Sequence, residues 1–269
     1  MGIVQGLTEF LPVSSSGHLI IVPYLLAPYL PGVTDPFITS LQFSVILHVG
    51  TLVALLLYFR ADWLRIVPAF LATLRDRSLR ADPDRRLAVL IALATVPALV
   101  IGYLLRDLES VIRGQVGLVA TMLVVGGAIL WLAERSGARS LVATDLSFSK
   151  ALAIGGAQAL ALVPGISRSG ISISAGLFAG LRRDQAARFS FLMATPITAA
   201  AAAYEVLNVV RGEATVFQPG PMAAGLATSF LFGILAIAVL LRLLRTRSTD
   251  VFVAYRLVLA AVVLVVWLG

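Results

Sequence analysis

The sequence of 269 residues is 59% hydrophobic and only 13% charged, with a formal net charge of +7 and no cysteine. About a quarter of the residues in a soluble domain are charged, so this composition excludes one and predicts a membrane protein that crosses the bilayer several times. The lack of cysteine excludes a disulfide framework, thiolate catalysis and cysteine-ligated metals. Because the basic residues lie in short loops between apolar segments, they are expected to set membrane orientation, and we expect no nucleic-acid partner.

Six apolar segments are long enough to cross a bilayer, which takes about 20 helical residues. They cover residues 37–59, 87–105, 116–133, 189–210, 221–241 and 251–268. We therefore predict an all-α integral membrane protein with six transmembrane helices. Its single membrane domain takes in residues 1–269.

Two further apolar regions, residues 1–30 and 151–181, are interrupted near their middles. The breaks are Pro-Val-Ser-Ser-Ser-Gly at 12–17 and Pro-Gly-Ile-Ser-Arg-Ser-Gly at 164–170. A helical half of about 12 residues covers only about 18 Å, which is too short to span a bilayer. We predict two re-entrant helix–loop–helix hairpins whose irregular backbone is buried in protein or lines a wet cavity.

Between the first two spans, residues 62–75 have the pattern of an amphipathic helix, with Arg65 and Arg75 off the apolar face. Two interpretations stay open: a helix that lies in the membrane interface, or a loop helix packed on the bundle. The apolar face holds Trp63, Ile66, Val67, Phe70, Leu71 and Leu74.

Lysine and arginine are distributed unequally between alternate loops. Four loops carry sixteen of the 21 basic residues: 60–86, 135–150, 182–188 and 242–247. The loops on the other side carry three, which are Arg106, Arg113 and Arg211. Because short loops rich in these residues stay in the cytoplasm, we expect the C-terminus outside. Met1 leads directly into an apolar run, so we expect no cleavable signal peptide.

The two interrupted regions resemble each other. Residues 5–17 and 158–170 share Gln-x-Leu, a proline and Ser-x-Ser-Gly, and the span after each begins with a similar Phe-Ser pattern. The charge distribution makes those two spans cross in opposite directions, which predicts an inverted-topology repeat of residues 1–133 and 151–268. Such repeats place a ligand site near the midplane, between broken helices. Chance similarity between two breaks rich in glycine, proline and serine is the alternative.

Glu9 is an acidic residue well inside an apolar segment, next to a backbone break. A carboxylate there is costly and by default marks function, although a structural role in capping a buried donor is the alternative. Gln5 lies four residues earlier, so both side chains project from one helical face. His18 lies three residues after Ser15 and is a candidate for proton transfer. A lone histidine is more often a hydrogen-bonded core residue, but Glu9 and the serines nearby favour function.

Arg168 is flanked by Ser167 and Ser169 at the start of a half-helix. A guanidinium, hydroxyls and free N–H groups at a helix N-terminus form an anion site of the kind that holds phosphate. The alternative is an ion pair with Glu9, and we expect both in turn, with the pair at rest and opening for substrate. His48, in the first span, is a weaker candidate that we expect to be a buried polar contact or to line the cavity.

Two stretches of the sequence resemble the signature motifs of bacterial undecaprenyl-pyrophosphate phosphatases of the bacitracin-resistance type. They are Gln-Gly-Leu-Thr-Glu-Phe-Leu-Pro-Val-Ser-Ser-Ser-Gly-His at 5–18 and Pro-Gly-Ile-Ser-Arg-Ser-Gly at 164–170. The similarity runs over essentially the whole chain. It implies a hydrolase in the bacterial inner (plasma) membrane that converts undecaprenyl diphosphate to the monophosphate carrier for peptidoglycan synthesis.

The resemblance also implies roles for particular residues. Ser15 matches the family's candidate nucleophile, and Ser167 with Arg168 matches its phosphate-binding pair. Ser172 stands where many relatives have threonine. The resulting catalytic set is Glu9, Ser15, His18 and Arg168. The substrate-binding set is Gln5, Ser14, Ser16, Ser167, Ser169, Gly170 and Ser172.

The expected reaction begins when the diphosphate enters the cavity from the outer face while the polyprenyl tail stays in lipid. Ser15 then attacks the terminal phosphorus, Glu9 or His18 accepts its proton, and water resolves the phosphoenzyme. Direct attack by a water that Glu9 activates stays open. On charge grounds we expect Mg²⁺ or Ca²⁺ to bridge Glu9 and the diphosphate. The sequence contains no multi-carboxylate cage, so the substrate would supply several ligands.

The same architecture is that of secondary carriers, so a polyprenyl-phosphate transporter or flippase using the midplane cavity is the alternative function. The meeting of an acid, hydroxyls, an imidazole and a guanidinium at one depth favours the enzyme. The expected partners are the polyprenyl diphosphate and membrane lipids, and a homodimer is left open.

Overall fold

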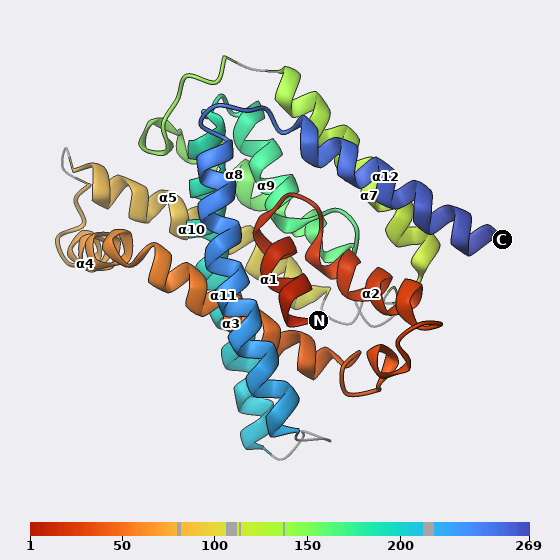
Figure 1. Ribbon diagram of the computed structural model, residues 1–269. Helices are drawn as coiled ribbons and strands as arrows, with labels where there is room; N and C mark the ends of the chain where they lie inside the picture. Colours follow the sequence, from red (N-terminus) through yellow and green to blue (C-terminus); the bar gives the residue numbers. More distant parts are fainter. Residues whose placement is uncertain (80–81, 106–111, 113, 137, 212–217) are drawn as a thin grey trace.

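The computed structural model describes residues 1–79, 82–105, 112, 114–136, 138–211 and 218–269. These residues are mainly helical, and within them extended pairing is limited to one isolated bridge between Leu141 and Leu181. The predicted all-α class is therefore confirmed (Figure 1).

Within the described residues, six helices are long and apolar enough to cross a membrane, in agreement with the six predicted spans. The sequence breaks that separate them also set their ends, because Pro83 and Pro219 occupy the first turn of their helices, where a missing N–H costs nothing. The helices are α3 (Leu41–Tyr58), α5 (Pro83–Leu104), α7 (Val116–Arg135), α10 (Arg183–Val210), α11 (Pro219–Leu243) and α12 (Asp250–Leu268).

The two interrupted apolar regions form pairs of short helices. The first pair is α1 (Gly2–Phe10) and α2 (Ser15–Leu26), and the second is α8 (Phe148–Gln158) and α9 (Arg168–Phe178). Each helix is too short to span a bilayer at 1.5 Å per residue. Three short 3-10 turns complete the described elements: Pro31–Thr34, Ala143–Asp145 and Ala159–Leu162.

The amphipathic segment forms α4 (Arg60–Asp76), which lies beside α5 in Figure 1. One face of α4 is apolar and packs inward, with Trp63 and Phe70 against the main core. Another apolar face points outward, because Leu64 is 76% exposed and Leu71 is 60% exposed. The helix is thus packed on the bundle and still offers an apolar surface to its surroundings.

The helices are arranged around α1, which packs against α11 and α3 near the centre of the molecule (Figure 1). Glycine permits the close approach of α1 to α11, because a Cβ at Gly2 would overlap Thr228 Oγ1. In the same way α8 approaches α5, since a Cβ at Gly155 would overlap the carbonyl oxygen of Ala94. Helices α7 and α12 run side by side and leave the centre together.

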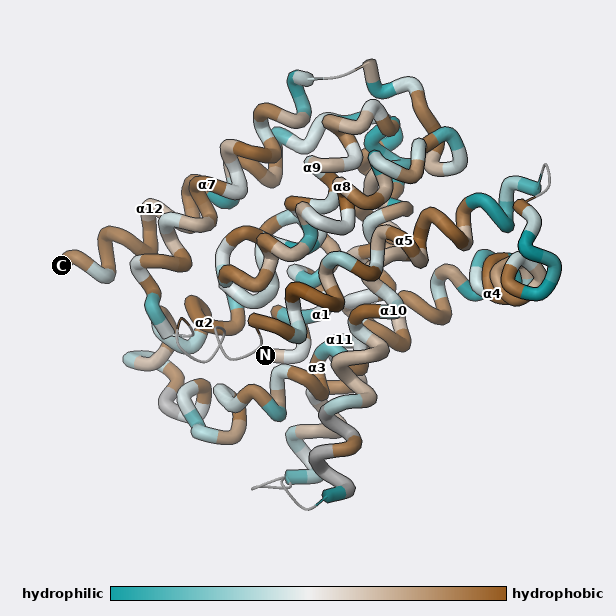
Figure 2. The backbone as a smooth tube through the Cα atoms, turned by 180° about the vertical axis from the view of Figure 1, so that it is seen from behind, coloured by the Kyte–Doolittle hydropathy of each residue, from teal (hydrophilic) through white to brown (hydrophobic). Residues whose placement is uncertain are grey.

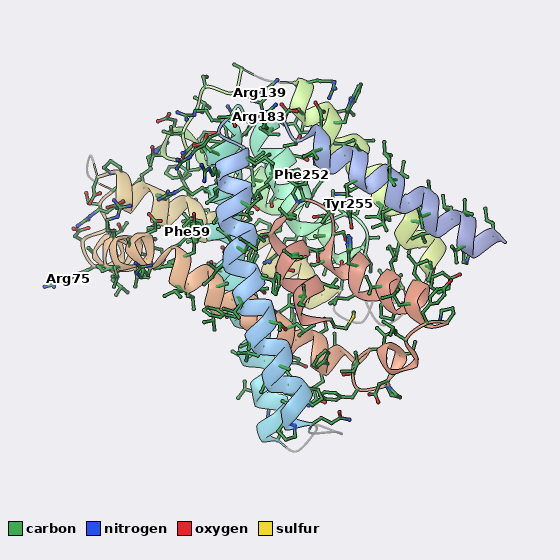
Figure 3. All side chains as sticks on the ribbon, in the orientation of Figure 1. Phe59, Arg75, Arg139, Arg183, Phe252 and Tyr255 are labelled. Atoms are coloured by element: carbon green, nitrogen blue, oxygen red, sulfur yellow. The ribbon has the colours of Figure 1, made fainter. Side chains whose placement is uncertain are left out.

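Residues in or next to the four arginine-rich loops contact one another at one end of the bundle. Asp62 accepts hydrogen bonds from Arg65 (2.8 Å) and from Arg188 (2.5 Å), which joins α4 to α10. Glu134, at the end of α7, contacts Arg183 and accepts from the N–H of Thr249 at 3.1 Å. Figure 2 shows hydrophilic residues at this end, and Figure 3 places Arg139 and Arg183 side by side there. The loops that the charge count grouped together are therefore neighbours in the fold.

Candidate active site

A cavity of about 320 Å³ lies between the two pairs of short helices and the long helices α3, α5 and α10. It has a polar part and an apolar part, so it fits an amphiphilic ligand better than a wholly polar one. The polar lining is Glu9, Ser15, Ser16, Ser44, His48, Gln158, Arg168 and Thr198. Much of the apolar lining comes from α5, α10 and the turn after α8: Ala98, Gly102, Ala159, Ala161, Leu162, Ile197, Ala201 and Ala202.

The first loop (residues 11–14) and the second loop (residues 163–167) end in the same local structure. Ser14 and Ser167 have φ angles of 75° and 77°, a region that non-glycine residues adopt only where the surroundings enforce it. Each is the N-cap of the next helix, and its hydroxyl accepts the N–H of Gly17 (3.3 Å) or Gly170 (3.1 Å). Ser15 and Arg168 consequently occupy the equivalent first position of α2 and α9.

The two loops are also bonded to each other. The N–H of Gly165 donates to Ser14 Oγ at 3.1 Å, and the hydroxyl of Ser169 donates to the carbonyl of Leu11 at 2.9 Å. These contacts hold the first helical positions of α2 and α9 at the wall of one cavity. The two motifs, whose contacting residues Ser14 and Gly165 are 151 positions apart in the chain, thus form one site.

Glu9 is the centre of that site and is only 5% exposed. Its Oε2 accepts hydrogen bonds from the Ser15 hydroxyl at 2.6 Å and from Gln5 Nε2 at 2.9 Å. Its Oε1 contacts Nη2 of Arg168, whose Nη1 donates to Thr198 Oγ1 at 2.8 Å. The structure therefore contains the ion pair considered from the sequence, and it places a serine hydroxyl on the same carboxylate.

His48 belongs to this cluster as well. Its Nδ1 lies 2.7 Å from the carbonyl oxygen of Ser44, and because a carbonyl only accepts, Nδ1 carries a proton. Its Nε2 faces Glu9 Oε2 at 3.5 Å. An ionisable residue within a span was the available sequence signal for His48. No spacing in the sequence, however, indicated that α3 brings it to Glu9.

The model of the bacitracin resistance protein BacA family matches residues 1–262. The chain belongs to this family. The undecaprenyl-diphosphatase of Gemmatimonas aurantiaca is 44% identical over 264 residues, which cover 98% of this chain and 94% of the relative. That of Rubrobacter xylanophilus is 45% identical, with the same two shares covered, and that of Methanosphaera stadtmanae is 36% identical over 275 residues. The resemblance seen in the motifs thus holds over the whole length of a multi-pass membrane protein.

In this member of the BacA family, His18 lies behind the first loop and not in the cavity wall. It is 4% exposed, and its ring stacks on Tyr255 with an interplanar angle of 8°. Its Nδ1 lies 2.7 Å from the carbonyl oxygen of Ser14, so Nε2 accepts the hydroxyl proton of Tyr255, also at 2.7 Å. Figure 3 labels Tyr255 on α12, a helix that the sequence did not connect with the site.

Some of the remaining predicted residues line the cavity, and the others hold the two loops in place behind it. Ser16 lines the cavity with Ser15. Ser172 is turned away from it, because its hydroxyl lies 2.6 Å from both the Arg168 carbonyl oxygen and Ser190 Oγ. The others form the frame of the loops, through hydroxyls, an amide or close backbone packing: Gln5, Ser14, Ser167, Ser169 and Gly170.

Gln158 is a cavity residue that the sequence indicated only as the start of the second repeat motif and not as part of the site. It is 4% exposed, and neither atom of its side-chain amide has a hydrogen-bond partner within the described part of the chain. It stands in the second repeat motif where Gln5 stands in the first. A buried amide without partners costs about 1–3 kcal/mol per unpaired group, so this one is suited to a bound water or ligand.

Proposed function

We propose that this chain hydrolyses undecaprenyl diphosphate to undecaprenyl phosphate and inorganic phosphate. The reaction returns the lipid carrier to peptidoglycan synthesis and underlies bacitracin resistance. The names of its relatives and of its family support this assignment over transport. The observation that carries it is the Ser15 hydroxyl on a carboxylate of Glu9 that also contacts Arg168, at the wall of a cavity with polar and apolar parts.

The diphosphate is held by the second loop. Arg168 offers a fork of donors, and the first turn of α9 adds N–H groups and the positive end of a helix dipole. Arg168 leaves Glu9 in part to reach the phosphates, while Thr198 keeps it oriented. The polyprenyl tail follows the apolar wall of α5 and α10 toward lipid. Preorganised donors of this kind stabilise the charge that gathers on a transferring phosphoryl group.

The first loop performs the chemistry. Ser15 Oγ attacks the terminal phosphorus, Glu9 takes its proton, and the bond from that phosphorus to the bridging oxygen breaks to release undecaprenyl phosphate. Glu9 passes that proton to the nearby His48 and is a free carboxylate again. It then accepts a proton from the water that attacks the phosphoserine and gives it to Ser15 Oγ, as the bond from phosphorus to that oxygen breaks and inorganic phosphate leaves. Attack by a Glu9-bound water without a phosphoserine is the other route, and the fate of Ser15 variants decides between them.

Glu9 is the base in this scheme because both nitrogens of His18 are already occupied by Ser14 and Tyr255. His48 supports Glu9 from the cavity side. Its Nε2 is 3.5 Å from Glu9 Oε2, so a proton that Glu9 receives has a second acceptor nearby. Protonated His48 also supplies a positive partner for Glu9 while Arg168 turns to the phosphates.

A divalent cation, Mg²⁺ or Ca²⁺, fits the site only if it arrives with the substrate. Within the described residues no group of three or more His, Asp or Glu side chains gathers, and both oxygens of Glu9 already have protein partners. Glu9 and the hydroxyls of Ser15 and Ser16 would hold such a cation together with phosphate oxygens. When bound, it would neutralise phosphate charge. Chelation with EDTA is expected to lower activity, and added Mg²⁺ or Ca²⁺ to restore it.

The membrane arrangement proposed with this function is an inverted repeat of residues 1–133 and 151–268 in one membrane domain. Each half contributes a re-entrant hairpin, at 1–30 and 151–181. The contacts support a two-fold relation, because α1 packs on α11 as α8 packs on α5, and α3 packs on α11 as α10 packs on α5. Gly2 and Gly155, which permit two of these contacts, stand at equivalent places before the two motifs, just ahead of Gln5 and Gln158.

The orientation follows from the arginine-rich loops, which we place in the cytoplasm of a bacterial inner (plasma) membrane. The cavity is lined by the middle and outer parts of the spans, from His48 and Thr198 to Gly102, and so lies away from those loops. It therefore opens toward the periplasmic or extracellular side. All of the site residues come from one chain, so the scheme needs no second copy.

The test is phosphate release from undecaprenyl diphosphate by the purified protein in detergent, where transport has no second compartment. Stoichiometric release of phosphate and undecaprenyl phosphate is expected. A folded preparation that binds the lipid and releases no phosphate, with or without divalent cations, would contradict the proposal and leave a transporter as the reading of the same cavity.

A further inference from the structure

Arg256, on the C-terminal helix α12, is a fully buried cation, with 0% of its surface exposed. Across the described residues, no carboxylate lies within ion-pair distance of it. Its hydrogen bonds all go to backbone carbonyls. Buried charges are ordinarily paired, because the loss of hydration is costly. Burial alone therefore does not explain an arginine without a counter-ion at this position, which indicates that its hydrogen bonds have a specific role.

The carbonyls that Arg256 binds belong to both loops of the site. Nη1 donates to Pro12 O at 3.1 Å in the first loop, and Nη2 donates to Gly165 O at 2.6 Å and Ile166 O at 3.0 Å in the second. Nε anchors the group on α7 through Leu123 O at 3.0 Å. One rigid fork thus holds the two segments that lead directly into the helices carrying Ser15 and Arg168.

The neighbouring helices are shaped to receive this side chain. A Cβ at Gly126 of α7 would overlap Arg256 Nη2 and would lie 2.7 Å from the Ile166 carbonyl oxygen. A Cβ at Gly170 of α9 would lie 3.0 Å from Nη1. Glycine at both positions leaves the space that the guanidinium occupies. Tyr255, the residue before Arg256, meanwhile braces His18 behind the first loop.

We infer that Arg256 is a positioning residue of the phosphatase site, which fixes the separation of Ser15 and Arg168 by clamping the carbonyls of both loops. Because these carbonyl oxygens accept hydrogen bonds from the Arg256 guanidinium, they point away from the incoming phosphates. The positive charge of Arg256, which has no counter-ion, also favours a bound anion. This inference rests on the proposed function. Misplacement of reacting groups by about 1 Å costs about 100-fold in rate, which sets the scale of the effect.

The decisive variant moves Arg256 without removing it. Gly126→Ala adds one methyl group where Nη2 and the Ile166 carbonyl oxygen that it binds meet, whereas the control Gly156→Ala adds a methyl group on α8 where no other atom lies within 4 Å. Both changes raise helix propensity by about 1 kcal/mol, so neither should weaken its helix. We expect Gly126→Ala to lower kcat by about 10- to 100-fold, and Gly156→Ala to keep the wild-type value.

Two direct substitutions complete the test. Arg256→Lys keeps the charge and loses the fork, so kcat should fall while binding of pyrophosphate, measured by calorimetry, is retained. Arg256→Met should lose both. The inference is overturned if folded Gly126→Ala and Arg256→Lys proteins keep the wild-type kcat, or if activity falls only in proportion to the folded fraction. Failure of the wild-type protein to release phosphate would instead count against the proposed function.

Discussion

The two loops end in the same local structure and lead into helices that carry different chemical groups. Each ends in an N-cap serine with a positive φ angle, and each places the next residue at the start of a helix beside the cavity. In the first loop that residue is Ser15 and in the second it is Arg168. Five residues before the cap serine stands Glu9, on α1, in one case and Leu162, in the turn after α8, in the other. The repeated local structure therefore supplies the geometry of the site. Differences at single equivalent positions make one half the nucleophile and base and the other half the phosphate-binding group.

The largest effect is expected from Ser15→Ala, which removes the attacking oxygen. If the reaction passes through a phosphoserine, kcat should fall by about 10⁴-fold or more. Mass spectrometry of the wild-type protein after an acid quench should then find phosphate on Ser15. The control is Ser149→Ala, at an exposed position on α8. Full activity of Ser15→Ala would reject the covalent route and leave attack by a Glu9-bound water.

Arg168→Gln is expected to lower kcat/KM by about 1,000-fold, because a guanidinium that stabilises a phosphoryl transition state contributes on that scale. The change also leaves Glu9 without its cation, so thermal unfolding is measured alongside turnover. Arg182→Gln removes a 54%-exposed guanidinium and should leave both quantities near wild type. Retained turnover in folded Arg168→Gln would end the assignment of phosphate binding to the second loop.

The two histidines differ in their positions, because His48 lines the cavity whereas His18 lies behind the first loop. His48→Gln removes the ionisable group that faces Glu9 and should lower kcat by about 10- to 100-fold, the range of one acid–base group. Tyr255→Phe removes the hydrogen bond behind His18 and should cost about 1 kcal/mol, which is a few-fold in rate at most. Steady-state kinetics of both variants checks this order. A larger loss in Tyr255→Phe would move the proton-transfer role to His18.

A smaller effect on rate than that of His48→Gln is expected from Gln158→Leu, with opposite signs for stability and activity. Removing a buried amide without partners should raise the free energy of unfolding by about 1 kcal/mol, whereas kcat/KM should fall by about 5- to 10-fold if a substrate or water uses that amide. Gln185→Leu, on α10, is the matched control and should leave kcat/KM unchanged. Higher stability with unchanged kcat/KM would show that Gln158 has no part in the site.

The sequence predicted much of the fold because its signals are local. The spans follow from runs of apolar residues, and the short helices follow from Pro12 and Pro164 with the serines after them. Glu9 and Arg168 were recognisable because a bilayer excludes charges that lack a function. Their ion pair was considered from the sequence, and the structure contains it.

The rest could not be predicted, because it depends on contacts between distant segments. Arg256 is a charge inside the predicted span 251–268 and so carries the same signal as Arg168, but it was counted only in the total of basic residues. Nothing near position 256 indicates its contacts with Pro12 and Gly165. Tyr255 and Gln158 carry no charge that an apolar segment would make conspicuous. His48 was noticed, but its distance to Glu9 depends on how α3 packs against α1.

The division of roles between the two loops is tested most directly by calorimetric titration of pyrophosphate into three proteins: wild type, Ser15→Ala and Arg168→Gln. If the first loop performs the chemistry and the second binds the phosphates, Ser15→Ala binds pyrophosphate as the wild type does, and Arg168→Gln loses at least about tenfold in affinity, or about 1.4 kcal/mol. Wild-type affinity in Arg168→Gln, or an equal loss in both variants, would contradict it.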